Sequence, residues 1–261
     1  MNHILREADD VYSAFGDHWA DVYDEYADTH NFPVENAKAV AFLAELVRDG
    51  TALELGCGNG HIALPLAEAG PQVHGLDNSA RMLDLLEEKN HQRLVQTHHG
   101  DMANFDLDRQ FDLVYCINNS FAHLLFVDRQ LACLHSVMRA VRDDGRFVLH
   151  LNMPNTTDFV GSGVYGNQRT TVVYVDEHRA IVRFTRHDQN NQMYVMQDLW
   201  MNRGEVRTLP SKLRYVYPSE LELLTRIVGL ELVERWEDWE RRPFDTSSVR
   251  HMSVYRKRRP S

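Results

Sequence analysis

A glycine-rich turn at residues 56–60 constrains the fold of this chain more than any other segment. The motif reads E-L-G-C-G-N-G from Glu54, follows a short apolar run at 51–55 and opens into a helix-like run at 61–70. A strand, a tight glycine turn and a helix N-terminus together form the nucleotide-cofactor site of an open α/β sheet. The glycines are spaced as G-x-G-x-G, whereas the dinucleotide fingerprint is G-x-G-x-x-G, so the spacing disfavours a nicotinamide oxidoreductase.

Three further strand-like runs end in polar residues. Residues 72–77 end at Asp77, residues 94–99 lead into Gly-Asp-Met, and the apolar run 111–117 leads into N-N-S-F-A-H-L. The run 111–117 is apolar enough to be a central strand that is buried on both faces. An acid at the tip of the second strand of a β-α-β unit is placed to bind the two hydroxyls of an adenosine ribose. The alternative role for Asp77 is to cap the following helix.

Together these segments resemble the class I S-adenosylmethionine (SAM) methyltransferases, in which E-L-G-C-G-N-G corresponds to motif I. The stretch C-I-N-N-S-F-A-H-L resembles the same region of small-molecule N-methyltransferases, including the glycine N-methyltransferase group and antibiotic-sugar N,N-dimethyltransferases. The resemblance covers about residues 10–150 well and the carboxyl third in outline. It implies SAM-dependent methyl transfer to a small-molecule acceptor, first of all an amine nitrogen of a metabolite or natural-product intermediate. Transfer to oxygen or carbon, and SAM binding without methylation, stay open as alternatives.

The resemblance also implies which residues form the site. Cofactor contacts are expected from the cap, the glycine turn and the strand tips, at Tyr23, Glu54, Gly56, Cys57, Gly58, Gly60, Asp77, Asn78, Met82, Asp101, Met102, Cys116 and Asn118. In the family the acid at the position of Asp101 meets the adenine amino group; a solvated turn residue is the alternative. Substrate contacts are expected from Tyr12, Phe121, His123 and Asn152.

Two residues are candidates for catalysis. Methyl transfer is an in-line displacement, so most of the rate can come from positioning, and few catalytic residues are expected. His123 follows the fourth strand near where the methyl should point, and an imidazole titrates in the useful range; a structural histidine is the alternative. Tyr23 resembles the amino-terminal tyrosine that closes over the methionine end of the cofactor in related enzymes. Tyr12 and Tyr26 compete for that role, and core packing is the alternative for all three.

Composition limits the partners. The net charge of −10 and pI of about 5.7 disfavour nucleic acid, whose phosphates would be repelled. Three cysteines without a C-x-x-C pattern indicate neither a zinc site nor a disulfide framework, and no apolar leader or membrane-spanning run occurs. Asp143 and Asp144 are expected at the wrong end of the sheet for a metal-dependent enzyme, so no metal is predicted. The sequence predicts a cytoplasmic protein with a small-molecule substrate and leaves homo-oligomerisation open.

Hydrophobic periodicity predicts four regions. A helical cap at 1–50 precedes a SAM-binding α/β core at 51–152, a β insertion at 153–217, and a carboxyl-terminal helix and hairpin at 218–261. The expected fold class is α/β, with a Rossmann-like seven-stranded methyltransferase sheet and an antiparallel β insertion after the fifth strand. The insertion should lie over the cofactor crevice and set substrate choice.

Local signals predict where the elements begin and end. Residues 31–33 should break the amino-terminal helices, and Asp143-Asp144-Gly145 should stop the helix at 125–141 before a strand at 146–151. Ser219 is a plausible cap and Gly229 a stop for the helix at 217–229. The remaining expected strands lie at 170–175, 180–186, 193–201, 205–217, 230–239 and 249–256.

Overall fold

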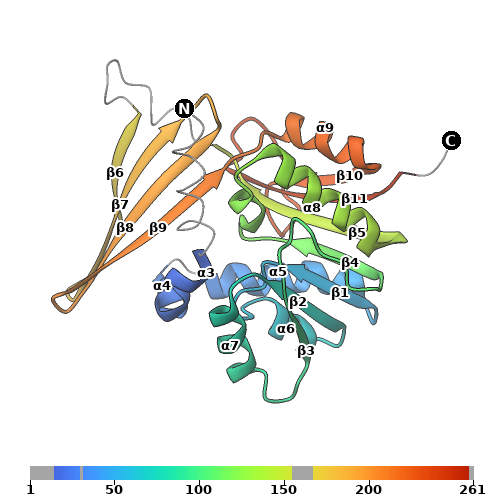
Figure 1. Cartoon of the computed structure of the whole chain (residues 1–261), viewed down its shortest axis with the longest axis horizontal. Helices are drawn as coiled ribbons and strands as arrows, with labels where there is room; N and C mark the ends of the chain where they lie inside the picture. The colour runs from blue at the N-terminus through green and yellow to red at the C-terminus, as the bar shows by residue number, and fades with distance from the viewer. Residues whose placement is uncertain (1–14, 30–31, 155–166, 259–261) are drawn as a thin grey trace.

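The computed structural model describes residues 15–29, 32–154 and 167–258, which form two β-sheets with helices around the larger one (Figure 1). The larger sheet has seven strands in the order β10-β11-β5-β4-β1-β2-β3. They are Thr51–Leu55 (β1), Gln72–Asp77 (β2), Val95–His99 (β3), Phe111–Cys116 (β4), Val141–Asn152 (β5), Leu230–Trp236 (β10) and Arg250–Lys257 (β11). The predicted fold class is confirmed.

The strand order places a crevice between β1 and β4. Strand β1 pairs in parallel with β2 on one side and with β4 on the other. The chain therefore runs outward from β1 to β2 and β3, then returns to β4 and continues to β5 in the opposite direction. In open α/β sheets, ligands bind outside the carboxyl ends of the strands at such a reversal point.

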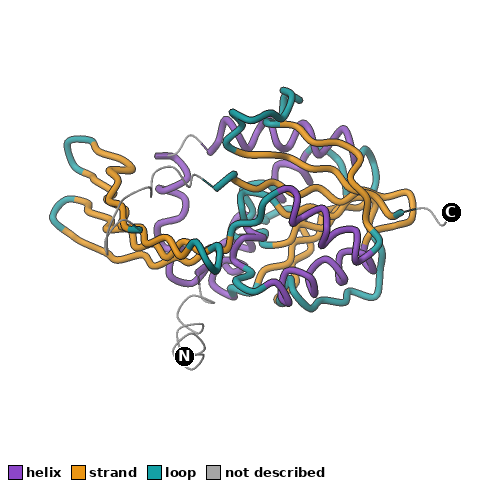
Figure 2. The backbone as a smooth tube through the Cα atoms, turned by 90° about the horizontal axis from the view of Figure 1, so that it is seen from above, coloured by secondary structure: helices purple, strands orange, loops and turns teal. Residues whose placement is uncertain are grey.

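Helices cover both faces of this sheet, as Figure 2 shows from above. Phe42, Leu66 and Leu86 belong to the hydrophobic core on one face, and Leu134 and Leu221 belong to the core on the other. The helices on the first face are Phe32–Val47 (α5), Ala63–Glu68 (α6) and Ala80–Lys89 (α7); those on the second are Val127–Ala140 (α8) and Pro218–Val228 (α9). Burial on both faces explains why the central strands are continuous apolar runs.

The carboxyl-terminal hairpin completes the sheet. Strand β11 pairs antiparallel with both β10 and β5. Helix α9 before the hairpin begins at Pro218 and ends at Val228. Its C-cap is Gly229, whose φ of 89° lies in the left-handed region that glycine accepts without strain. The N-cap is Tyr217 without a side-chain hydrogen bond, so the expectation that Ser219 caps this helix is wrong. Proline at the first helical position makes the cap less necessary, because it has no N–H to satisfy.

The second sheet is antiparallel and packs against the amino-terminal helices. Trp19 is buried with Ile181, Trp200 and Leu209 of the sheet, and its Nε1 donates to the carbonyl oxygen of Pro210 at 3.3 Å. The strands are Gln168–Val175 (β6), Arg179–Asp188 (β7), Met193–Asn202 (β8) and Glu205–Arg214 (β9). The amino-terminal elements are Phe15–Trp19 (α3), Ala20–Val22 (η1) and Tyr23–Thr29 (α4). Helices α3 and α4 and the second sheet therefore form one layer beside the main sheet (Figure 1).

Two predicted boundaries are wrong. Strand β5 begins at Val141 and continues through Asp143, Asp144 and Gly145, because Val141 already pairs with Phe111 and a register shift absorbs the extra residues. The break expected at 31–33 is placed too far along the chain, because α5 already begins at Phe32 and Pro33 lies in its first turn, where a missing N–H breaks no helical hydrogen bond. The two helices are separate as expected, since α4 ends at Thr29.

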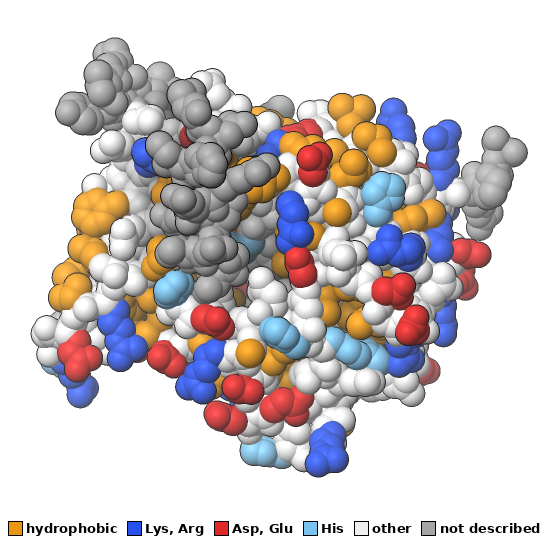
Figure 3. Space-filling model, in the orientation of Figure 1, with side chains coloured by type: hydrophobic (Ala, Val, Ile, Leu, Met, Phe, Trp, Pro, Cys, Tyr) orange, Lys and Arg blue, Asp and Glu red, His pale blue; other side chains and the backbone are white. Residues whose placement is uncertain are grey.

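The surface carries both signs of charge. On the face in Figure 3, Lys and Arg side chains are interspersed with Asp and Glu, and apolar side chains gather on the left over the second sheet. That sheet exposes Val172, Val175, Phe184 and Val206. None of the helices in the described ranges is long and apolar enough to cross a membrane.

A first prediction tests the start of β5. A Cβ at Gly145 would lie 2.9 Å from the carbonyl oxygen of Asp112 and 3.0 Å from that of Phe111, both on the neighbouring strand. Gly145→Ala should lower the free energy of unfolding by about 1–3 kcal/mol, because backbone atoms cannot yield as a side chain can. Urea unfolding measures the loss, and Asp144→Ala, at an exposed neighbour, is the control. Equal stabilities of the two variants would contradict this account.

Candidate active site

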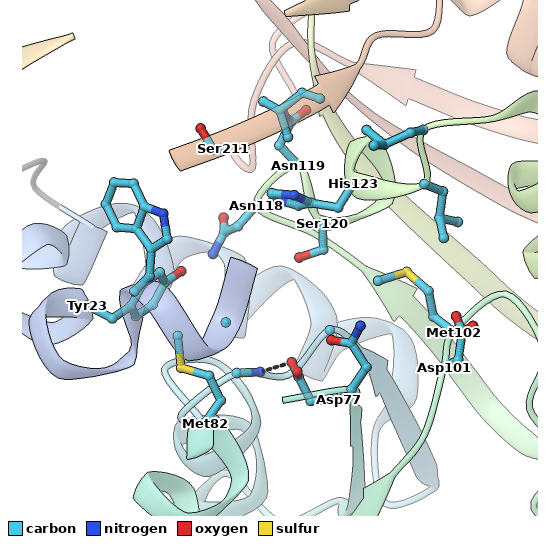
Figure 4. Close-up of a pocket in the computed structure, with 18 of the residues that line it drawn as sticks. Tyr23, Asp77, Met82, Asp101, Met102, Asn118, Asn119, Ser120, His123 and Ser211 are labelled. Atoms are coloured by element: carbon cyan, nitrogen blue, oxygen red, sulfur yellow. Dashed lines mark hydrogen bonds between the residues drawn. The ribbon is translucent and has the colours of Figure 1, made fainter. Parts of the chain in front are cut away.

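A cavity of about 590 Å³ lies at the carboxyl edge of the main sheet (Figure 4). Its wall combines the turn after β1, the tips of β2 and β3, the turn after β4, the amino-terminal helices and the inner face of the second sheet. The volume falls in the range of pockets that enclose a cofactor or drug-sized ligand. The sequence segments that carry motifs thus meet at one place, as parallel strand ends require.

The glycine turn exposes backbone to this cavity. Gly56 and Gly58 line the wall with φ values of 74° and 51°. A Cβ at Gly58 would meet only the Sδ of Met82, at 4.0 Å, so it would project into the open cavity. The N–H groups of Gly56 and Cys57 donate to the carbonyl oxygen of Leu76 at 2.8 and 3.1 Å. The turn is therefore fixed to β2 while its inner side stays open to a ligand.

Asp77 joins the glycine turn to helix α7. One carboxylate oxygen accepts the N–H of Gly58 at 2.8 Å, and the other accepts the N–H of Ser79 at 2.9 Å. Ser79 itself is the N-cap of α7, because its Oγ accepts the N–H of Met82 at 3.1 Å, so Asp77 is not the helix cap. Burial raises the pKa of Asp77, while these N–H donors oppose the shift. Each oxygen keeps a lone pair with which to accept a ligand hydroxyl.

Asp101 is engaged at the tip of β3. One of its oxygens accepts the N–H of Ala103 at 2.9 Å, and the other forms an ion pair with Arg129 of α8. Both charged residues line the cavity, as does Met102. The carboxylate is therefore partly exposed, charge-paired and held in one orientation beside the ligand space.

The turn after β4 supplies the facing wall. Asn118 and Asn119 both have left-handed backbones, with φ values of 52° and 67°, which asparagine tolerates better than most residues. The 3-10 helix Ser120–His123 (η2) follows and brings His123 to the cavity. Burial lowers the pKa of His123 to about 4. A base this weak is a poor proton acceptor near neutral pH, although the neutral ring can form hydrogen bonds.

The amino-terminal cap is fastened over the glycine turn. Asp24 of α4 accepts hydrogen bonds from Asn59 at 2.7 Å and Lys89 at 2.9 Å, and lies 2.7 Å from Nε2 of His61. The adjacent Tyr23 lines the cavity and packs edge-to-face on the ring of His61. Burial raises the pKa of Tyr23, so its phenol stays protonated.

The second sheet forms the far wall of the cavity. Arg183 is held by the buried Asp198 through two hydrogen bonds of 2.7 Å and donates to the Tyr26 hydroxyl at 3.2 Å. Met196, Ser211 and Leu213 line the wall beside Arg183. The charge of this arginine is compensated within the wall itself.

The structure brings most of the expected site residues to the cavity wall. They are Tyr23, Gly56, Gly58, Asp77, Asn78, Met82, Asp101, Met102, Asn118, His123 and Asn152. Tyr12 lies outside the described residues.

Five expected site residues do not line the cavity. Glu54 is buried behind the turn, where its Oε2 accepts the Tyr115 hydroxyl at 3.2 Å and burial raises its pKa. Cys57 and Gly60 pack against the core beneath the turn, while Cys116 and Phe121 are fully buried in the hydrophobic core. Their places in the motifs reflect packing of the turns around the cavity rather than exposure to it.

Other residues of the wall were missed. Asn119 and Ser120 belong to the motif C-I-N-N-S-F-A-H-L, and Trp19 lies in a segment, residues 11–26, that is rich in aromatic side chains. The sequence therefore contained signals for these three residues. The contribution of Arg183 and Met196 has no local sequence signal, because only the packing of the second sheet brings them near.

Known proteins share this architecture. A methyltransferase-domain family model matches residues 52–145. The structure of the CcbJ methyltransferase from Streptomyces caelestis is 34% identical, with a TM-score of 0.87 over 94% of this chain and 98% of that chain. Cypemycin N-terminal methyltransferase from Streptomyces sp is 28% identical over 70% of this chain and 73% of its own length. The dTDP-3-amino-3,6-dideoxy-alpha-D-glucopyranose N,N-dimethyltransferase of Streptomyces fradiae is 32% identical over 53% of this chain and 56% of its own length.

The fold, the glycine turn and the acid at the tip of β2 define a nucleotide-cofactor enzyme of the class I methyltransferase type. With the comparisons, this chain belongs to the SAM-dependent methyltransferase family. The enzyme class and cofactor inferred from the sequence are confirmed.

A second prediction concerns the charge of His123. Because the folded-state pKa is about 4, its ring should stay neutral as the pH falls from 7.5 to about 5. Protonation favours the unfolded state as the pH falls below the unfolded pKa of about 6.5. The stability that the neutral ring contributes is therefore present above that pKa and falls by about 1.4 kcal/mol by pH 5.5. An NMR titration of the histidine ring protons tests this, with His123→Asn to assign the signal. A midpoint near 6.5 for that signal would contradict the burial argument.

Proposed function

We propose that this methyltransferase methylates an amine nitrogen of a small metabolite or natural-product intermediate. The supporting observation is the form of the cavity, which extends from the glycine turn to a compartment enclosed by the β4 turn and the second sheet. Two relatives are named for amine acceptors, a sugar N,N-dimethyltransferase and an N-terminal methyltransferase of cypemycin. The three cysteines are free and buried, which supports the proposed cytoplasmic location, and the net charge of −10 supports the proposed absence of a nucleic-acid partner.

The wall offers groups suited to each part of SAM. We assign the ribose hydroxyls to Asp77, whose two oxygens are fixed by backbone donors and still accept. We assign the adenine to the space beside Asp101 and Met102, and the methionine end to the open backbone of Gly56 and Gly58. When bound, SAM would supply a sulfonium methyl that an amine lone pair can attack in line, with the thioether sulfur of S-adenosylhomocysteine as the leaving group.

The compartment beyond the cofactor is polar but has little uncompensated charge. Asn118 and His123 approach from the core, and Ser211 and the paired Arg183 approach from the second sheet. A partly buried guanidinium that is already neutralised by a carboxylate favours a neutral oxygen of the acceptor over a second carboxylate. We propose an acceptor whose body carries hydroxyl or carbonyl groups around the reacting amine.

The protein then acts mainly through positioning. The wall holds the amine in line with the methyl and excludes water, which is the contribution expected for a displacement at carbon. His123 is neutral at physiological pH and can accept a hydrogen bond from the amine, although its low pKa makes it a weak general base. Tyr23 covers the methionine end as a protonated phenol. Transfer would leave the nitrogen positively charged, and this ammonium then loses its proton to solvent.

A third prediction tests the cofactor assignment. Asp77→Ala should weaken SAM binding about 10- to 150-fold, the equivalent of about 1.5–3 kcal/mol for lost hydrogen bonds to a charged group. Isothermal calorimetry measures the affinity, and circular dichroism shows whether the fold is retained. Asp144→Ala, which removes an exposed acid far from the cavity, is the matched control. SAM affinity within twofold of the parent in a folded Asp77→Ala protein would remove the ribose role.

A fourth prediction tests the reaction itself. With isotopically labelled methyl-SAM, a panel of amine- and hydroxyl-bearing metabolites should give labelled product and S-adenosylhomocysteine only with amines. Intact-mass spectrometry detects the added methyl, and fragmentation of the labelled product locates it. Labelled ether or carbon-methyl products would instead support an oxygen or carbon acceptor. SAM binding without turnover on any acceptor would support a SAM-binding protein of this fold that does not methylate.

A further inference from the structure

A buried histidine braces the turn that follows β4. His150 lies on β5 beside that turn, and its Nδ1 accepts the backbone N–H of Asn118 at 3.2 Å. Its carbonyl oxygen accepts the N–H of Asn119 at 3.3 Å. One residue therefore holds both of the consecutive left-handed positions, whose φ values are 52° and 67°.

Two other residues, Asn152 and Asn36, fix the side chains of the turn. Asn119 accepts the N–H of Asn152 through Oδ1 at 3.1 Å, which ties the turn to the end of β5. Asn118 donates from Nδ2 to Oδ1 of Asn36 at 3.4 Å. This orientation leaves Oδ1 of Asn118 as the acceptor that the turn offers to a ligand in the cavity, across from Tyr23 (Figure 4).

The chemistry of His150 is specific for this contact. To accept from Asn118 at Nδ1, the ring must be neutral with its proton on Nε2, and burial lowers its pKa to about 3. Within the described part of the chain, Nε2 is buried and has no hydrogen-bond partner, and the ring packs edge-to-face against Trp239. An apolar residue would fill the same space without that unsatisfied donor, so the Nδ1 contact is what the histidine adds.

We propose that His150 is a positioning residue for methyl transfer, holding Asn118 so that its Oδ1 faces the amine at the methyl position. The inference deepens the proposed function, since it takes the β4 turn as the acceptor-side wall. His150 does not line the cavity itself and acts through Asn118.

The neighbouring strand offers a matched control. His251 on β11 is also fully buried, its Nε2 also lacks a partner among the described residues, and burial lowers its pKa to about 3. Its Nδ1 lies 2.9 Å from Oγ of Ser253. Because Met252 is the register partner of His150, His251 points to the opposite face of the sheet.

Two SAM analogues make the test independent of the acceptor. S-adenosylhomocysteine lacks the methyl, whereas sinefungin carries an amine-bearing carbon in place of the methylated sulfur. The sinefungin amine therefore occupies the place of the transferable methyl, where it probes the same part of the wall that the acceptor amine must approach. The ratio of the two dissociation constants therefore measures contacts of the wall with the group at that position. A change elsewhere in the cofactor site affects both analogues equally and leaves the ratio unchanged.

Calorimetry on four proteins decides the question. His150→Phe keeps a ring but removes the acceptor, and should weaken sinefungin about tenfold while changing S-adenosylhomocysteine less than threefold. His150→Asn places an oxygen near the former Nδ1 and should restore most of the sinefungin affinity. His251→Phe should leave the ratio at the parent value.

Three results would overturn the proposal. His150 would be a structural residue if the parent did not distinguish the two analogues. The same conclusion would follow if His150→Phe left the ratio unchanged or weakened both analogues equally. Should His150→Phe fail to fold by circular dichroism, the same ratio measured on His150→Leu and His150→Asn decides, with the leucine variant expected to lose the preference. Because neither analogue is a methyl donor, these results do not depend on whether the acceptor screen finds an N-methylated product.

Discussion

The site depends on one carboxylate, that of Asp77, which the end of β2 holds between two backbone donors. The bonds to the N–H groups of Gly58 and Ser79 join the turn after β1 to the start of α7. A carboxylate that accepts backbone N–H groups is fixed in direction before any ligand arrives, which lowers the entropy that binding must remove. The glycine turn is fixed by the same contacts, and the open face at Gly58 follows from them.

The cap and the second sheet depend on that frame in turn. Asp24 binds Asn59 of the glycine turn and Lys89 at the end of α7, so the cap is anchored to the elements that Asp77 joins. Trp19 then packs against the second sheet through Trp200 and Leu209. The far wall of the cavity, including Arg183, therefore packs on the cap. Arg214 at the end of β9 also fastens the second sheet to the helices of the main sheet, through Gln130 of α8 at 2.7 Å and Glu220 of α9 at 2.6 Å.

The sequence predicts the main sheet well because each signal is local. Thr51–Leu55 and Gln72–Asp77 have the predicted boundaries, since apolar runs between glycine turns and acids have few alternative structures. The errors arise where pairing overrides local preference: Asp143 and Asp144 look like a turn, yet they continue β5 because Val141 already pairs with Phe111. The second sheet was expected from its short β-like runs between polar turns, but its face toward the cavity depends on register, which no local pattern fixes.

Within the site, the sequence alone does not distinguish residues that line the cavity from residues that only support its wall. Glu54 and Cys57 stand in the glycine motif beside Gly56 and Gly58, but a strand directs alternate side chains to opposite faces and a tight turn buries its own interior. Glu54 therefore meets Tyr115 below the turn, while the backbone of Gly58 meets the cavity. His150 is the opposite case: it belongs to no motif, and yet its side chain accepts the backbone N–H of Asn118 and holds that residue in place. A motif of this kind encodes the shape of the turn first, and contact with the ligand follows from where the backbone is left open.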